Sequence, residues 1–242
     1  MLLALSCVLY LFAGQATVFA ADYYDETDSV VFSEDAAYFK FNDSDVTKYI
    51  ANRCFAKNVV FTDSEKQIMH DYTYNKATPI NSSIDAAQGE ITTLKPELQK
   101  EITLLDQATH KMMIPWNIIV YRYVYSSFLL DLGLTEEDLA TYYVNGQFAP
   151  EILDKIVSGT LYTKHSFMST TALKNGAMTH RPIELRIRVK RGSYAAFVEP
   201  YSYVPSELEF LFPRESKLEV IGAYVSEDHK RLNIEVNFKG SL

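Results

Sequence analysis

The chain has 242 residues, of which 48% are hydrophobic and 22% charged, so its composition is neither that of a disordered protein nor that of a membrane-embedded one. This length favours one domain with a full hydrophobic core. The net charge of −8 argues against a nucleic-acid partner, because proteins that bind nucleic acids normally carry a basic face.

Residues 1–20 have the pattern of a secretory signal peptide. An apolar run over residues 2–12 is followed by Val18-Phe19-Ala20, which places small residues where signal peptidase requires them. The run is too short to span a bilayer comfortably, so no stable membrane insertion is expected. No Lys or Arg precedes it, which leaves an uncleaved anchor or a buried first helix as the alternatives. The pattern predicts a secreted, extracellular protein in which Cys54 is the one remaining cysteine and forms no internal disulfide.

The first half of the mature chain is predicted to be helical after an acidic arm at residues 21–45. Apolar residues recur at helical spacing up to about Met113, with a cap candidate at Thr62 and a helix start at Pro96. Three stripes carry this pattern: Val46, Ile50 and Cys54; Ile68 and Tyr72; and Leu98, Ile102, Leu105 and Ala108. Two later short helices are expected, one from Thr135 with Asp138 in a loose capping box and one over residues 150–159.

The second half changes to strand periodicity. Residues 118–121 form a buried-strand run, and residues 183–189 alternate strictly between apolar and charged side chains. Further strands are predicted at residues 194–198, 209–212, 218–225 and 232–238. Helices followed by antiparallel strands predict an α+β fold, with a single domain over residues 46–242.

Several common kinds of chemistry have no signal in the sequence. There is no glycine-rich phosphate loop of either common type, so neither a P-loop nor a Rossmann nucleotide site is expected. The five histidines show no metal-ligand spacing, and no metal is expected. A Ser-His-Asp hydrolase is not excluded by residue types, but the Gly-x-Ser-x-Gly elbow is absent.

Three short elements matter only in combination: Tyr121-Arg122, Ser169-Thr170-Thr171 and Glu207-Leu208-Glu209. An arginine that leaves a buried strand needs an anionic partner, and a salt bridge to a core carboxylate is its simplest explanation. A hydroxyl cluster on a strand is most often ordinary edge polarity. Acidic residues two apart recur elsewhere in this chain, so the last pair is no evidence by itself.

In this order and at these spacings, the three elements resemble the arginine–serine–glutamate class of bacterial mono-ADP-ribosyltransferase toxins. The similarity extends over roughly residues 75–242 and, in the stretches 114–118, 164–182 and 198–214, is close to secreted streptococcal arginine-specific exotoxins. The resemblance implies N-terminal helices packed on a mostly antiparallel β-sandwich core, with NAD as co-substrate. The chain departs from the class at Thr171, where Ser is usual, and neither Tyr201 nor Tyr203 lies where many relatives place a target-reading aromatic residue.

The resemblance also assigns roles within NAD cleavage. Breaking the bond between nicotinamide and ribose develops an oxocarbenium-like cation, which a carboxylate at Glu209 would stabilise. Arg122 and Arg181 would hold the pyrophosphate, since a guanidinium fork suits phosphate oxygens. Ser169 would keep Glu209 and Arg122 in register through hydrogen bonds. Tyr121 and Thr170 complete the expected NAD-contacting set.

Glu207 determines the expected acceptor. An arginine side chain stays protonated at physiological pH, so it needs a general base before it can attack. In the family, Glu at this position accompanies transfer to arginine and Gln accompanies transfer to asparagine. The resemblance therefore predicts transfer to arginine on a host protein, for which a cytoskeletal protein such as actin is one candidate. Two alternatives stay open: an NAD glycohydrolase with water as its main acceptor, and a secreted binding module whose site residues are relics.

Overall fold

The computed structural model describes residues 38–41, 55 and 59–241. The predicted signal peptide and the stripe Val46, Ile50 and Cys54 lie outside these residues, as does most of the acidic arm. Among the described residues, no helix combines the length and the apolarity needed to cross a membrane.

A layer of helices opens the described chain, as the periodicity predicted. It comprises α4 (Asp63–Asp71), a π-helix (Tyr72–Lys76), α5 (Ala77–Ala86), a short 3-10 turn (Ile91–Thr93) and α6 (Pro96–Thr109). Thr62 and Glu65 form a complete capping box on α4, and Pro96 occupies the first turn of α6. The buried faces of these helices form one hydrophobic cluster with side chains from the sheet: Ile68, Met69, Tyr72, Ile84, Ile102, Leu105, Phe167 and Leu211.

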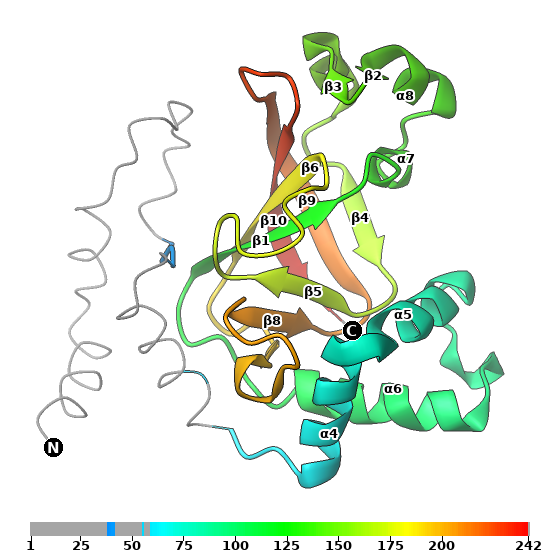
Figure 1. The fold of residues 1–242 in the computed structure, drawn as a ribbon, viewed down its shortest axis with the longest axis vertical. Coiled ribbons are helices and arrows are strands. Elements are labelled where there is room, and N and C mark those ends of the chain that lie inside the picture. The colour runs from blue at the N-terminus through cyan, green and yellow to red at the C-terminus, as the bar shows by residue number, and fades with distance from the viewer. Residues whose placement is uncertain (1–37, 42–54, 56–58, 242) are drawn as a thin grey trace, which may run out of the picture.

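The rest of the core is an eight-stranded sheet in the order β4-β9-β10-β6-β1-β5-β8-β7. Its strands are β1 (Ile118–Val124), β4 (Leu161–Lys164), β5 (Met168–Thr171), β6 (Ile183–Val189), β7 (Ala196–Phe197), β8 (Glu209–Phe212), β9 (Ser216–Val225) and β10 (Leu232–Gly240). All neighbours pair antiparallel except β10 and β6, which are parallel. The predicted α+β class is confirmed (Figure 1). The strands of the expected sandwich form one sheet, in which each strand is hydrogen-bonded to the next.

A group of small elements lies between β1 and β4: α7 (Phe128–Asp131), α8 (Glu136–Tyr142), the hairpin β2 (Tyr143–Val144) and β3 (Gln147–Phe148), and a 3-10 helix (Pro150–Lys155). The capping box predicted at Thr135 and Asp138 is present with both of its hydrogen bonds. The helix predicted over residues 150–159 is shorter and of the tighter 3-10 type, because the backbone is already extended at Ile156.

The strand predicted at residues 194–198 is also shorter, since only Ala196 and Phe197 pair with β8. The chain leaves the sheet at Val198 and enters a 3-10 helix (Glu199–Tyr201) with Pro200 in its first turn. Residues 199–208 then form a loop that returns to β8, and we call it the 199–208 loop.

Candidate active site

Three neighbouring strands in the middle of the sheet bring the three sequence elements together. Tyr121 on β1 lies opposite Thr171 on β5, and Thr171 lies opposite Glu209 on β8. Because these residues share one level of the sheet, the arginine, hydroxyl and glutamate elements meet although 88 positions separate Tyr121 from Glu209 in the chain (209 − 121). Figure 1 shows β5 between β1 and β8, with α4, α5 and α6 alongside.

Ser169 connects the arginine to the glutamate through two different atoms. Its backbone carbonyl accepts a hydrogen bond from Arg122 Nη1 at 2.6 Å. Its hydroxyl donates to the Glu209 carboxylate oxygen Oε1. The arrangement fixes both charged groups to one residue of the central strand.

Glu209 is a buried carboxylate, with 5% of its surface exposed. Burial raises its pKa to about 7, and the charges of Glu207 and Glu199 act in the same direction. The hydrogen bond from Ser169 and the positive charge of Arg122 oppose this change. A cation that develops beside such a carboxyl group favours its ionised form, and the ionised form stabilises the cation in return.

Within the part of the chain that the structure describes, neither arginine of the site forms an ion pair. No carboxylate of the described residues forms an ion pair with Arg122 or Arg181, so the simpler explanation of Arg122 as a core salt bridge does not hold for the described chain. Burial lowers the pKa of the Arg122 guanidinium. Arg181 Nη1 donates to the Tyr123 carbonyl at 3.0 Å, and its guanidinium lies 4.9 Å from the centre of the Tyr125 ring.

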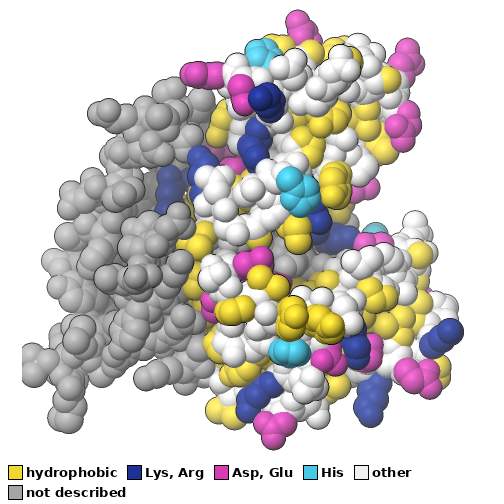
Figure 2. Space-filling model, viewed as in Figure 1, with side chains coloured by type: hydrophobic (Ala, Val, Ile, Leu, Met, Phe, Trp, Pro, Cys, Tyr) yellow, Lys and Arg dark blue, Asp and Glu magenta, His cyan; other side chains and the backbone are white. Residues whose placement is uncertain are grey.

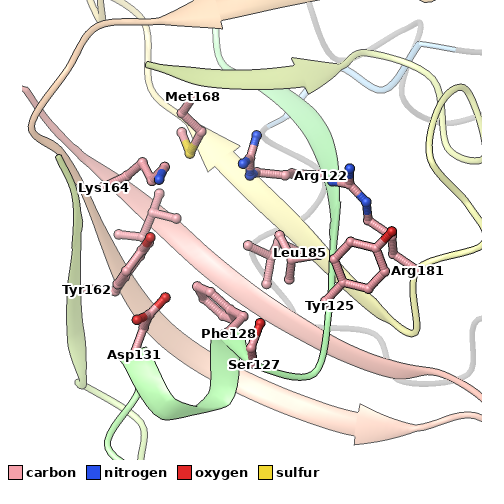
Figure 3. Close-up of a pocket in the computed structure, with 12 residues that line it drawn as sticks. Arg122, Tyr125, Ser127, Phe128, Asp131, Tyr162, Lys164, Met168, Arg181 and Leu185 are labelled. Carbon is pink, nitrogen blue, oxygen red and sulfur yellow. The ribbon is translucent and has the colours of Figure 1, made fainter. Parts of the chain in front are cut away.

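Both guanidinium groups line an open pocket of about 190 Å³ (Figure 3). The remaining lining residues come from β1, the turn after it, α7, β4, β5, β6 and β9: Val124, Tyr125, Ser127, Phe128, Asp131, Tyr162, Lys164, Met168, Leu185 and Leu218. Arg122 and Arg181 lie near each other at one side of the pocket, whereas Asp131, Ser127 and Tyr162 lie across from them. Two unpaired cations beside aromatic and apolar walls form a suitable site for an anionic, ring-containing ligand.

Glu207 is half-buried on the 199–208 loop, two residues before β8 begins at Glu209. Burial raises its pKa above the usual range, and the nearby charge of Glu199 adds to this effect. The Thr171 hydroxyl donates to the Glu207 backbone carbonyl at 2.6 Å, which ties the loop to β5. This hydrogen bond needs only the hydroxyl group of Thr171, which a Ser at this position would also provide.

Of the expected NAD-contacting set, Arg122 and Arg181 line the pocket, whereas Ser169, Glu209, Tyr121 and Thr170 do not. Tyr121 is buried in a cluster with Ile119 and Tyr123, because alternate residues of β1 face opposite sides of the sheet and Arg122 takes the other side. Thr170 is buried as well, and its hydroxyl donates to the Phe210 carbonyl at 3.0 Å. In this structure the Tyr121 side chain packs in that cluster and the Thr170 side chain contacts β8, and their contact with NAD stays a prediction.

An exposed aromatic patch includes Tyr203, which lies on the same 199–208 loop as Glu207; the sequence analysis considers Tyr203 but does not predict its partner in the helical layer. Tyr203 on the 199–208 loop and Tyr74 on the π-helix are 53% and 55% exposed, with ring centres 4.4 Å apart. The Tyr203 amide donates to the Thr73 hydroxyl at 2.8 Å, which fastens the loop to the helical layer. Figure 2 shows hydrophobic side chains gathered beside a histidine where α4 meets this loop; His70 lies 5.8 Å from Tyr203 between ring centres.

Comparisons with known proteins agree with this geometry. The sequence profile of the ADP-ribosyltransferase exoenzyme family matches residues 38–240. The epidermal cell differentiation inhibitor of Staphylococcus aureus is 27% identical over 80% of this chain and 81% of its own length. The mono-ADP-ribosyltransferase C3 of Hathewaya limosa is 27% identical over 84% of this chain and 80% of its own length.

Solved structures show the same fold. The crystal structure of the Clostridium limosum C3 exoenzyme has a TM-score of 0.74 and 26% identity, and covers 84% of this chain and 97% of the exoenzyme. The structure of C3stau2 from S. aureus with NAD has a TM-score of 0.77 and 24% identity, and covers 84% of this chain and 99% of its own. The chain therefore belongs to the ADP-ribosyltransferase exoenzyme family, and NAD is its co-substrate.

Proposed function

We propose that this protein is an arginine-specific mono-ADP-ribosyltransferase, which cleaves NAD between nicotinamide and ribose and transfers the ADP-ribose to an arginine side chain of a host protein. Glu207 carries the proposal, because it adds a second carboxylate beside Glu209 and has a pKa above its usual range. A carboxylate with a raised pKa is a stronger base, which suits removal of a proton from a guanidinium.

The geometry supports separate roles in NAD cleavage. Arg122 and Arg181 would bind the pyrophosphate, since their guanidinium groups line the pocket and form no ion pair with any described carboxylate. Glu209 would stabilise the cation that develops on the ribose as the nicotinamide leaves, an effect that is strong for a buried carboxylate. Ser169 would hold Glu209 at the orientation that its hydrogen bond now fixes.

Water would replace the acceptor when no arginine is bound, so NAD hydrolysis would accompany transfer. The side chain of Glu207 is only half-buried, which leaves the acceptor side open to solvent. Hydrolysis would not require a strong base at Glu207, because the oxocarbenium-like cation accepts water readily.

A small-molecule assay tests the choice of acceptor. The protein is incubated with labelled NAD and one of two acceptors, agmatine, which carries a free guanidinium group, or an asparagine amide. We expect an ADP-ribosyl-guanidine product with agmatine and none with the asparagine amide. Transfer to the amide alone would overturn the proposed arginine specificity, and NAD hydrolysis without transfer to either would favour a glycohydrolase.

The aromatic patch of Tyr74 and Tyr203 supports a protein as the acceptor. Exposed aromatic residues of this kind are enriched where proteins dock; Tyr203 lies on the loop that carries Glu207, and Tyr74 packs against it. An acceptor arginine that approaches Glu207 along this face would bring the residues that flank it against the patch.

Replacing Tyr203 with alanine is expected to raise the KM for a protein acceptor by roughly tenfold, because one buried aromatic contact is lost at the interface. NAD hydrolysis should be unchanged, since Tyr203 does not line the pocket. Tyr194→Ala serves as the control, because Tyr194 is also exposed (40%) but packs against His110, away from the loop. Equal KM values for the wild type and Tyr203→Ala would remove the patch from acceptor binding.

We propose further that the protein is secreted and that its catalytic domain covers residues 46–242. We also propose that its nearer relatives are streptococcal exotoxins. The signal pattern at residues 1–20 supports export, and a cytoskeletal host protein such as actin is the first acceptor to test. Sequencing the N-terminus of the exported protein would show whether cleavage occurs after residue 20 or 21.

A further inference from the structure

We propose that Glu199 is a positioning residue that holds the backbone on both sides of Glu207 and so aims the Glu207 carboxylate at the acceptor. This inference rests on the role proposed for Glu207 in arginine transfer.

The carboxylate of Glu199 reaches across the neck of the 199–208 loop. Its oxygen Oε1 accepts a hydrogen bond from the Ser206 amide at 2.5 Å, and Oε2 accepts one from the Leu208 amide at 2.9 Å. These two amides are the immediate neighbours of Glu207 in the chain. Hydrogen bonds from amides to an ionised carboxylate are about twice as strong as neutral ones, so a single side chain grips both sides of Glu207.

The conformation that Glu199 holds is unfavourable without support. Ser206 has a φ of 90° and Leu208 a φ of 47°, and both lie in the left-handed region that side chains with a Cβ rarely adopt. Such a conformation persists only when surrounding contacts fix it. The two amides that Glu199 binds belong to these same two residues, so its carboxylate stabilises the strained turn directly.

The remaining backbone groups around Glu207 are fixed by β5. The Thr171 hydroxyl donates to the Glu207 carbonyl at 2.6 Å, and the Ala172 amide donates to the Leu208 carbonyl at 3.1 Å. Among the described residues, the Glu207 carboxylate itself forms no hydrogen bond or ion pair. The backbone is therefore held at every side while the carboxylate stays available, which is the arrangement that a general base requires.

Glu199 also places a third carboxylate beside the reacting pair. Three charged groups affect the pKa of Glu209: Glu207 and Glu199 on the loop, and Arg122 on β1. The charge of Glu209 in turn raises the pKa of Tyr72 on the π-helix. The negative charge of Glu199 raises the pKa of both Glu207 and Glu209. Removing the charge of Glu199 should therefore shift the pH profile of the reaction, whereas replacing a neutral structural residue should not.

The test compares Glu199→Gln, Glu199→Asp and Glu199→Gln combined with Glu207→Gln, with Glu227→Gln as the control. Gln has the shape of Glu but offers one acceptor oxygen and no charge, whereas Asp keeps the charge on a shorter side chain. Glu227 is exposed in the turn before β10, and its carboxylate has no hydrogen bond or ion pair to another described residue, so its replacement removes the same charge at a distance. Transfer to agmatine and NAD hydrolysis are measured over a range of pH.

We expect Glu199→Gln to lower the ratio of transfer to hydrolysis by at least roughly tenfold, because small displacements of a catalytic group are costly. The acidic limb of its pH profile should move to lower pH, since the loss of a negative charge lowers the pKa of the remaining carboxyl groups. Glu199→Asp should restore part of the ratio and keep the limb in place. Glu227→Gln should match the wild type.

The double variant separates positioning from damage to the fold. If Glu199 acts through Glu207, Glu199→Gln/Glu207→Gln hydrolyses NAD at about pH 8.5, above the acidic limb, as fast as Glu207→Gln alone. Three results would each overturn the inference. The first two are a transfer-to-hydrolysis ratio in Glu199→Gln equal to that of the wild type, and an acidic limb that does not move. The third is a loss of NAD hydrolysis on adding Glu199→Gln to Glu207→Gln that equals the loss it causes in the wild type. Normal transfer by Glu207→Gln alone would instead overturn the proposed function, so the two failures are distinguishable.

Discussion

Replacing Glu209 with glutamine is expected to lower the rate of NAD cleavage by about 10²- to 10³-fold, and to make the folded protein more stable above pH 7. Activity falls because the amide carries no charge with which to stabilise the cation that develops on the ribose. Stability rises because the buried carboxylate no longer has to ionise in a site where 5% of its surface is exposed.

The size of the stability change follows from the pKa of Glu209. This pKa is about 7 in the folded protein against a reference value of 4.5. Because the folded value is the higher one, the ionised carboxylate destabilises the fold as pH rises from 4.5 towards 7, and the effect is complete above that. The difference of 2.5 pH units (7 − 4.5), at about 1.36 kcal/mol each, corresponds to about 3 kcal/mol.

Urea unfolding of the wild type and Glu209→Gln at about pH 5 and pH 8.5 measures this change. We expect nearly equal free energies of unfolding at the lower pH and a more stable variant at the higher pH. In the wild type, kcat/KM for NAD hydrolysis should rise with pH through about 7, as Glu209 ionises in the free enzyme. A variant that is less stable at both pH values, or that keeps normal hydrolysis, would contradict the role of Glu209.

Replacing Glu207 with glutamine is expected to reduce transfer to arginine by about a hundredfold or more while most NAD hydrolysis remains. The variant loses the base that would take the guanidinium proton but keeps Glu209, Ser169 and Arg122, which act on NAD. The ratio of labelled agmatine to free ADP-ribose measures the effect in a single reaction. Persistent transfer by Glu207→Gln would show that another group removes the proton.

The pKa of the acceptor separates a base from a mere binding contact. Acylguanidines lose their proton more readily than alkylguanidines, so the defect of Glu207→Gln should become smaller with an acylguanidine acceptor. A defect of the same size with both acceptors would instead indicate that Glu207 binds the guanidinium without removing its proton.

The sequence predicts the regular elements well where a periodic pattern and an end signal coincide. Residues 183–189 alternate strictly and form β6, and Thr135 with Asp138 forms the expected capping box. The edge strand β7 is shorter than predicted, because the chain leaves the sheet at Val198 in a turn that no periodicity marks. The sequence pattern also does not predict the parallel pairing of β10 with β6, because these strands are not consecutive in the chain.

The candidate site is only partly visible in the sequence. Residue type and order were enough to select Arg122, Ser169 and Glu209, which the sheet brings together. The place of Tyr121 beside Arg122 leads to its predicted contact with NAD, and the structure adds that the two neighbouring side chains face opposite sides of the sheet. Glu199 gave no signal, because its role depends on how the 199–208 loop folds back on itself.

The π-helix (Tyr72–Lys76) has no signal in the sequence for a related reason. Its residues continue the helical pattern from α4 into α5, so no break in the periodicity distinguishes it. Its contribution to the site, the Thr73 hydroxyl and the Tyr74 ring, depends on contacts with a loop 130 positions away.

Mass spectrometry of host-cell lysate incubated with the protein and labelled NAD tests transfer to arginine most directly. We expect ADP-ribose on arginine side chains of one or a few host proteins, and no such modification after treatment with Glu207→Gln. ADP-ribose on asparagine or another residue type, or labelling by Glu207→Gln equal to that by the wild type, would contradict the account.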